Sequence, residues 1–260
     1  MNFQMQMELQ QWLAEIRPIP LDASLSDGAM DALSRIYIAL YNFVAGDGTE
    51  DGYESSQEYA TALDSLCDLS RTRCERLRTA STVTTLYRLL RGPMRPTDGA
   101  CIAECHRWIA EIIAAGEQNA WNEIPVHEAL DRMELLYAVS DSELDPEREC
   151  TLERLVGLAG AQLLPELADK TDLSVADCRA LAQLYDLTMW GVGAPDPQTV
   201  DTIVDLARRL PEASRTSSEN SLPPLSLSSS EARLWCLAIL TDHACRILSS
   251  ALETEYFACA

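Results

Sequence analysis

Helical periodicity is the feature of this sequence that most constrains its fold. Apolar residues recur three and four positions apart along nearly the whole chain, and the alternation at every second residue that is typical of strands is almost absent. One such stripe contains Met5, Leu9, Trp12, Leu13 and Ile16. The pattern predicts an all-α fold, a multi-helix bundle of about eight or nine helices with antiparallel helical hairpins.

Signals for helix ends divide the first half of the chain. Ser26 can accept a hydrogen bond from a free amide as the N-cap of a second helix, and Gly46 can end that helix. A third helix is expected to begin near Ser56 and to break within the β-branched segment 79–85. A fourth helix is expected after Asp98.

The second half of the chain contains a weak internal repeat. Asp145-Pro146 and Asp196-Pro197 each precede an apolar helical segment. Asp accepts hydrogen bonds from free amides as an N-cap, and Pro has the backbone angle that the first helical position requires. The repeat therefore predicts two helical hairpins that turn at Asp-Pro, with chance similarity between amphipathic helices as the alternative.

Composition along the chain suggests its domain organisation. Residues 1–210 are expected to form the helical bundle, either as one unit or as two sub-bundles that meet near 92–98. Residues 211–230 hold eight Ser and three Pro, which predicts a linker or a long loop. Residues 231–260 predict an amphipathic helix that docks on the bundle. The alternative is that this helix docks on a second molecule and mediates oligomerisation.

Cysteine usage and hydropathy indicate a compartment. The nine cysteines are odd in number and include no CxxC pair, so we expect free thiols in a reducing cytoplasm. The N-terminal segment lacks the basic start of a signal peptide. No apolar run reaches the roughly 18 residues that a membrane span needs. We therefore expect a soluble, cytoplasmic protein without a membrane span.

The charge distribution is strongly uneven. The chain has a net charge of −21, yet the segment 71–95 holds seven Arg against the single acid Glu75, a net of +6 that leaves −27 for the remainder. This arginine cluster supplies the candidate residues for binding a partner: Arg71, Arg73, Arg76, Arg78, Arg88, Arg91 and Arg95.

Three roles compete for the arginine cluster. Acidic residues elsewhere in the chain can neutralise it internally, which is the hypothesis that the large negative remainder favours. The cluster can instead bind an acidic or phosphorylated protein through two-point pairing of guanidinium groups with carboxylates or phosphates. Nucleic-acid binding comes last, because the rest of the protein repels phosphate and few aromatic residues accompany the arginines.

One acidic segment resembles an EF-hand calcium loop. In residues 47–58, the oxygen-bearing side chains of Asp47, Thr49, Asp51, Ser55 and Glu58 take loop positions one, three, five, nine and twelve. Gly52 takes position six, where an EF-hand loop turns sharply. Ca²⁺ prefers such a cage of oxygen ligands. The segment therefore predicts Ca²⁺ as the one candidate cofactor, against the alternative of a plain solvated turn.

A second acidic turn spans residues 141–149. It resembles the acidic turn between helices of TerB-type tellurite-resistance domains, which typically have Gly where this chain has Ser142. The resemblance covers only this short segment, and it implies no function here. Acids favoured by the dipole of the following helix are the simpler explanation.

No motif for catalysis stands out. The chain has no glycine-rich phosphate loop, nucleophile elbow or di-iron pattern, and its three histidines are scattered. The sequence thus favours a non-enzymatic acidic helical protein–protein interaction module whose partner is another protein. A cation-binding or sensing protein that uses residues 47–58 is one alternative, an acidic inhibitor that mimics a nucleic-acid surface is another, and a helical enzyme without a recognised motif is the last.

Overall fold

The computed structural model describes residues 2–47, 50–91, 99–116, 125–140, 146–190, 195–213 and 227–258. In these ranges the protein contains ten helices and no strand, which confirms the predicted all-α bundle with a slightly higher helix count. The helices are α1 (Asn2–Ile16), α2 (Asp27–Asp47), α3 (Glu50–Arg76), α4 (Ala80–Arg91), α5 (Gly99–Gly116), α6 (Val126–Ser140), α7 (Pro146–Ala168), α8 (Val175–Trp190), α9 (Pro197–Ala213) and α10 (Leu227–Ala258).

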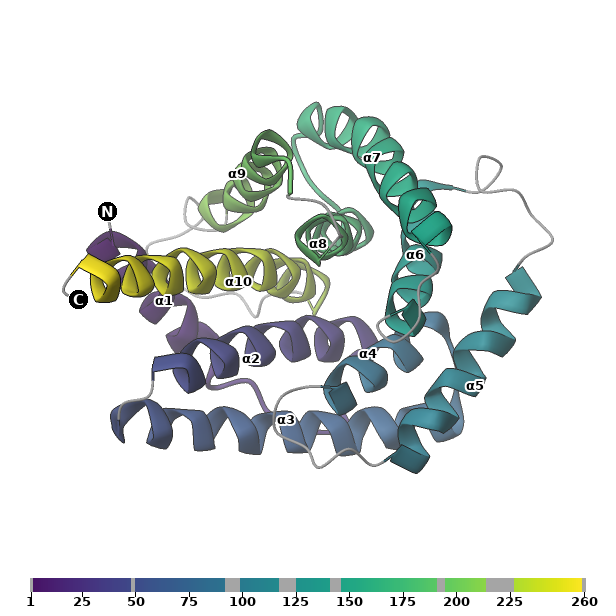
Figure 1. The fold of residues 1–260 in the computed structure, drawn as a ribbon, viewed down its shortest axis with the longest axis horizontal. Coiled ribbons are helices and arrows are strands. Elements are labelled where there is room, and N and C mark those ends of the chain that lie inside the picture. Colours follow the sequence, from purple (N-terminus) through teal and green to yellow (C-terminus); the bar gives the residue numbers. More distant parts are fainter. Residues whose placement is uncertain are drawn as a thin grey trace.

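Helices α2 and α10 lie side by side in the middle of the molecule (Figure 1). Helices α3 and α4 cover α2 from the other side, while α8, α9 and α1 pack against α10. Helices α5, α6 and α7 close the remaining side, and both chain ends lie near α1 (Figure 1). Two helices distant in sequence therefore form the centre around which the others are arranged.

One continuous apolar core draws on all ten helices. Helix α10 is buried at Leu234, Leu237 and Leu248, which lie on one face, and Trp235 and Cys236 on its other sides are buried as well. Helix α10 is thus enclosed on several sides rather than docked by a single apolar face, because α1, α2, α8 and α9 all contact it.

Several helix ends follow from local chemistry as expected. The hydroxyl of Ser26 accepts a hydrogen bond from the amide of Ala29 at 3.0 Å and donates one to Glu231 of α10 at 2.5 Å, so it caps α2 and joins it to α10. Helix α5 begins directly after Asp98. Helices α7 and α9 both begin at the proline of an Asp-Pro pair, as the repeat predicts.

The third helix differs from expectation at its start. It begins at Glu50, well before Ser56. The break predicted within residues 79–85 lies slightly earlier, at residues 77–79 between Arg76 and Ala80. There the hydroxyls of Thr79 and Thr82 accept hydrogen bonds from each other's amides, at 3.2 and 3.0 Å, which starts α4 anew.

The proposed domain boundaries fall partly outside the described residues. These are the junction at 92–98 and, within the predicted linker, residues 214–226. Helix α9 continues to Ala213 and α10 begins at Leu227, so helical structure occupies both ends of the segment 211–230. Of the helices that the structure describes, none is both long and apolar enough to cross a membrane.

The N-cap of α9 is formed by Asp196. The Asp196 carboxylate accepts hydrogen bonds from the amide and the hydroxyl of Thr199 at 3.1 and 2.6 Å, which lowers its pKa. Asp196→Ala should lower the free energy of unfolding at neutral pH, because the free amides of the first turn of α9 lose their acceptor. The loss should vanish as pH falls through the folded pKa, where the cap is protonated. Urea denaturation at neutral and at acidic pH measures the loss and its dependence on pH. The control is Asp205→Ala at an exposed position of the same helix, which should change the free energy of unfolding little.

Candidate functional site

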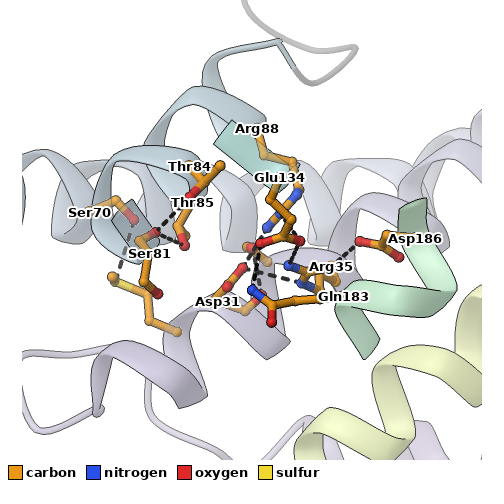
Figure 2. Close-up of polar contacts among 12 residues, drawn as sticks. Asp31, Arg35, Ser70, Ser81, Thr84, Thr85, Arg88, Glu134, Gln183 and Asp186 are labelled. Atoms are coloured by element: carbon orange, nitrogen blue, oxygen red, sulfur yellow. Dashed lines mark hydrogen bonds and ion pairs between the residues drawn. The ribbon is translucent and has the colours of Figure 1, made fainter. Parts of the chain in front are cut away.

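The most extensive polar arrangement among the described residues is an ion network inside the bundle (Figure 2). Helices α2, α4, α6 and α8 all contribute to it. Its members, which we call the buried ion network, are Asp31, Arg35, Arg88, Asp131, Glu134, Arg179, Gln183 and Asp186.

Arg35 is the centre of the network. Its guanidinium group donates to Asp31 at 3.3 Å, to Glu134 at 2.5 Å and, through a third nitrogen, to Asp186. The side chain is only 5% exposed. Its carbon Cζ also lies 5.3 Å from the centre of the Trp235 ring, so the cation faces an aromatic surface of α10. One arginine therefore joins α2 to α6, α8 and α10.

Three further side chains complete the pairing. Arg88 of α4 donates to Asp31 and, at 3.3 Å, to Glu134. The amide of Gln183 donates to Asp131 at 2.7 Å and to Glu134 at 2.9 Å, which bridges two acids of α6 from α8. Arg179 pairs with Asp131 at 2.6 Å at the more exposed edge of the network.

The network contains four carboxyl groups against three guanidinium groups, so it has one excess acid. Burial opposes ionisation of Asp31, but the nearby cations Arg35 and Arg88 hold its pKa below the usual range. Burial raises the pKa of Asp131, and it raises the pKa of Asp186 to about 6 despite the neighbouring Arg35. Asp186 is therefore the group that accepts a proton first as the pH falls.

This arrangement is suited to holding helices rather than to reacting. Each of its three guanidinium groups is paired with at least one carboxylate, and Gln183 bridges the two acids of α6. Oδ2 of the almost completely buried Asp31 is the network's one carboxylate oxygen found buried without a hydrogen-bond partner. The network thus links four helices through ion pairs, and we assign it a structural role.

The arginine cluster predicted from the sequence is divided by the fold. Arg88 belongs to the buried ion network. Arg73 pairs with Asp27 and donates to the backbone oxygens of Leu25 and, at 3.3 Å, Ala23, at the start of α2. These two arginines act inside the molecule, in line with internal neutralisation. Arg71 and Arg91 take part in other interactions, and Arg95 lies outside the described residues.

Two members of the cluster face solvent at the turn between α3 and α4. Arg76 and Arg78 are exposed on either side of Leu77, whose surface is 60% exposed. The guanidinium carbon of Arg78 lies 4.7 Å from the centre of the Trp108 ring of α5, which fixes its position. Neither arginine forms an ion pair with a carboxylate that the structure describes. We call Arg76, Leu77 and Arg78 the basic corner.

The acidic segment 47–58 spans the end of α2 at Asp47 and the start of α3 at Glu50, so its residues from Glu50 onward are helical. The calcium site proposed on Asp47, Asp51, Ser55 and Glu58 stays a prediction. Glu58 pairs with Arg17 at 3.3 Å, and Thr49 lies outside the described residues. No group of three potential ligand side chains within the described ranges is placed to hold a metal ion.

Sequence analysis did not single out the buried ion network. Asp31 and Arg35 lie one helical turn apart in a segment of α2 whose residues are nearly all buried, and that enclosure depends on helices far away in the chain. A local signal was available in the spacing of Asp31 and Arg35, which is that of an ion pair on one helix face. Their partners Glu134 and Asp186 have no such signal.

Comparisons of the chain with protein-family models, with curated proteins and with solved structures find no match.

The network predicts a large effect of removing its central cation. Arg35→Met should lower the free energy of unfolding by about 3–5 kcal/mol, because Asp31 and Glu134 would remain buried with too few cations. Denaturant unfolding measures the loss. Arg17→Met, which removes an exposed ion pair with Glu58, is the matched control and should cost less than about 1 kcal/mol. Equal losses in the two variants would contradict a structural role for the network.

The raised pKa of Asp186 predicts a specific dependence on pH. Between about pH 4 and pH 6 the folded protein holds a proton that the unfolded chain releases, so the contribution of Asp186 to the free energy of unfolding falls as pH rises. Asp186→Asn removes this titration. The free energy of unfolding of the variant should therefore gain about 2 kcal/mol relative to wild type between pH 4 and pH 7. A difference that stays constant over this range would exclude the raised pKa.

Proposed function

We propose that the protein is a non-enzymatic, acidic helical interaction module that binds an acidic segment of another protein at the basic corner. The observation that carries the proposal is the exposure of Arg76 and Arg78 on either side of the exposed Leu77. Two guanidinium groups beside an apolar side chain fit a short acidic segment that contains an apolar residue.

The setting of the basic corner supports binding. Trp108 lies beneath Arg78 and restricts its side chain, which reduces the conformational entropy that binding would cost. Among the described residues, Arg76 has no ion pair that would have to break before a partner binds. Arg73 and Arg88, in contrast, would have to leave buried or partly buried carboxylates.

The overall charge narrows the class of partner. A chain with a net charge of −21 repels nucleic acid and anionic membranes at long range, whereas exposed charges are screened beyond about 10 Å at moderate salt. A small acidic protein segment can therefore bind locally where an extended polyanion is repelled. We place this binding in the cytoplasm, since the seven described cysteines are all free thiols.

A triple substitution tests the proposal. The full-length protein is used to capture partners from lysate at low and at moderate salt, next to R76Q/L77S/R78Q. A matched control, R107Q/R154Q/L158S, removes the same charge and an equally exposed leucine elsewhere. Wild type and control should capture the same acidic protein, whereas the corner variant should lose it.

The captured protein is then purified and its affinity is measured directly. Loss of affinity of at least about tenfold in the corner variant, together with weakening by salt, is the expected result. Partners that bind the corner variant as tightly as wild type, or no partner for wild type at either salt, would refute a binding site at the basic corner.

A further inference from the structure

The most exposed residues of α1 carry no charge. Its two acids are partly buried: Glu8 accepts a hydrogen bond from Gln4 at 3.2 Å, and Glu15 pairs with Arg233 of α10 at 2.5 Å. Every exposed residue of this helix from Phe3 to Ile16 is apolar or an uncharged amide. The exposed faces of α3, α5, α7 and α9 all include charged residues. In a chain with a net charge of −21, an uncharged helix face is the kind of surface on which two copies can meet without bringing like charges into direct contact.

Two large apolar side chains stand on this face. Phe3 is 76% exposed and Met7 54% exposed, whereas Leu9 and Ile16 on the opposite side of the helix are buried in the core. The helix packs against α10. Helix α1 therefore has two apolar sides, only one of which is covered by the part of the chain that the structure describes. Figure 1 shows α1 at one end of the bundle, beside α10.

The exposed residues follow the spacing of a coiled-coil seam. Phe3, Met7, Gln10 and Ala14 are separated by four, three and four positions, and all four are exposed. Such a stripe continues along one side of a helix for its whole length and matches a similar stripe on a partner helix.

The stripe is complementary to itself when two copies run antiparallel. With the two-fold axis midway between Met7 and Gln10, Phe3 of each copy faces the small Ala14 of the other, and Met7 faces Gln10. On one flank of the stripe, the exposed Gln4 of each copy lies nearest Gln11 of the other, so each amide can donate to and accept from another amide. The largest side chain of the stripe thus opposes the smallest, and amides oppose amides on the flank.

We infer that the protein forms a two-fold symmetric dimer through antiparallel packing of α1 against α1 of a second copy. The C-terminal helix, which the sequence suggested for oligomerisation, has its residues from Ala232 to Leu248 largely buried against α1, α2, α8 and α9 of its own chain. The α1 surface is separate from the basic corner, so this inference is independent of the proposed function.

Sedimentation of the full-length protein across a range of concentrations tests the dimer. Wild type should shift from 28.8 kDa to twice that mass as concentration rises. M7E/Q10E places acids opposite acids across the two-fold axis and should weaken dimerisation by at least about tenfold. L158E changes a leucine of α7 that is about as exposed as Met7, and this variant should dimerise like wild type.

A third variant tests the register. M7K/Q10E puts lysine opposite glutamate in the antiparallel dimer and should keep it, whereas a parallel pairing would put like charges together. Circular dichroism checks that the variants, all at exposed positions, remain folded. A monomeric wild type, a dimer that L158E breaks and M7E/Q10E does not, or loss of the dimer in M7K/Q10E would overturn the inference.

Discussion

The enclosure of α2 is the constraint on which the rest of the structure depends. Helices α3, α4 and α10 all pack on α2, so its polar side chains cannot all reach solvent, and Asp31 and Arg35 are buried together with Met30 and Leu33. A buried charge costs several kcal/mol unless an opposite charge compensates it. The helices that close around α2 must therefore bring ionic partners, and they do so from α4, α6 and α8.

This requirement restricts how the helices can be placed. Displacing α8 along its axis by one turn, about 5.4 Å, would carry Gln183 and Asp186 away from their partners and leave Arg35 and Glu134 undercompensated. Apolar packing alone tolerates such shifts far better, because one leucine can replace another. The buried ion network therefore contributes more to the choice of one packing than to the size of the free energy of unfolding, since an apolar cluster of the same volume could be equally stable.

Local features of the fold could be predicted from the sequence and distant pairings could not. Ser26 and Asp196 cap helices through bonds to residues three positions away, and Pro197 begins α9 for a reason contained in one residue. Arg35, in contrast, meets Glu134 and Asp186 across 99 and 151 positions of sequence. Periodicity identifies the apolar face of a helix, but it cannot indicate that a central helix such as α2 or α10 will be covered on its other faces as well.

The division of the arginine cluster shows why a charge count misjudges a surface. Arg73 and Arg88 pair with carboxylates of the same chain, which leaves Arg76 and Arg78 as two exposed members of the cluster without an ion pair among the described residues. A field from two exposed charges extends about one Debye length, so it acts on a short segment rather than on a whole polyanion. The proposed binding at the basic corner should therefore weaken as salt rises, whereas the inferred association through α1 should not, because salt also screens the repulsion between two acidic copies. Salt thus distinguishes the two proposals: it should favour the inferred dimer and weaken binding of the proposed acidic partner.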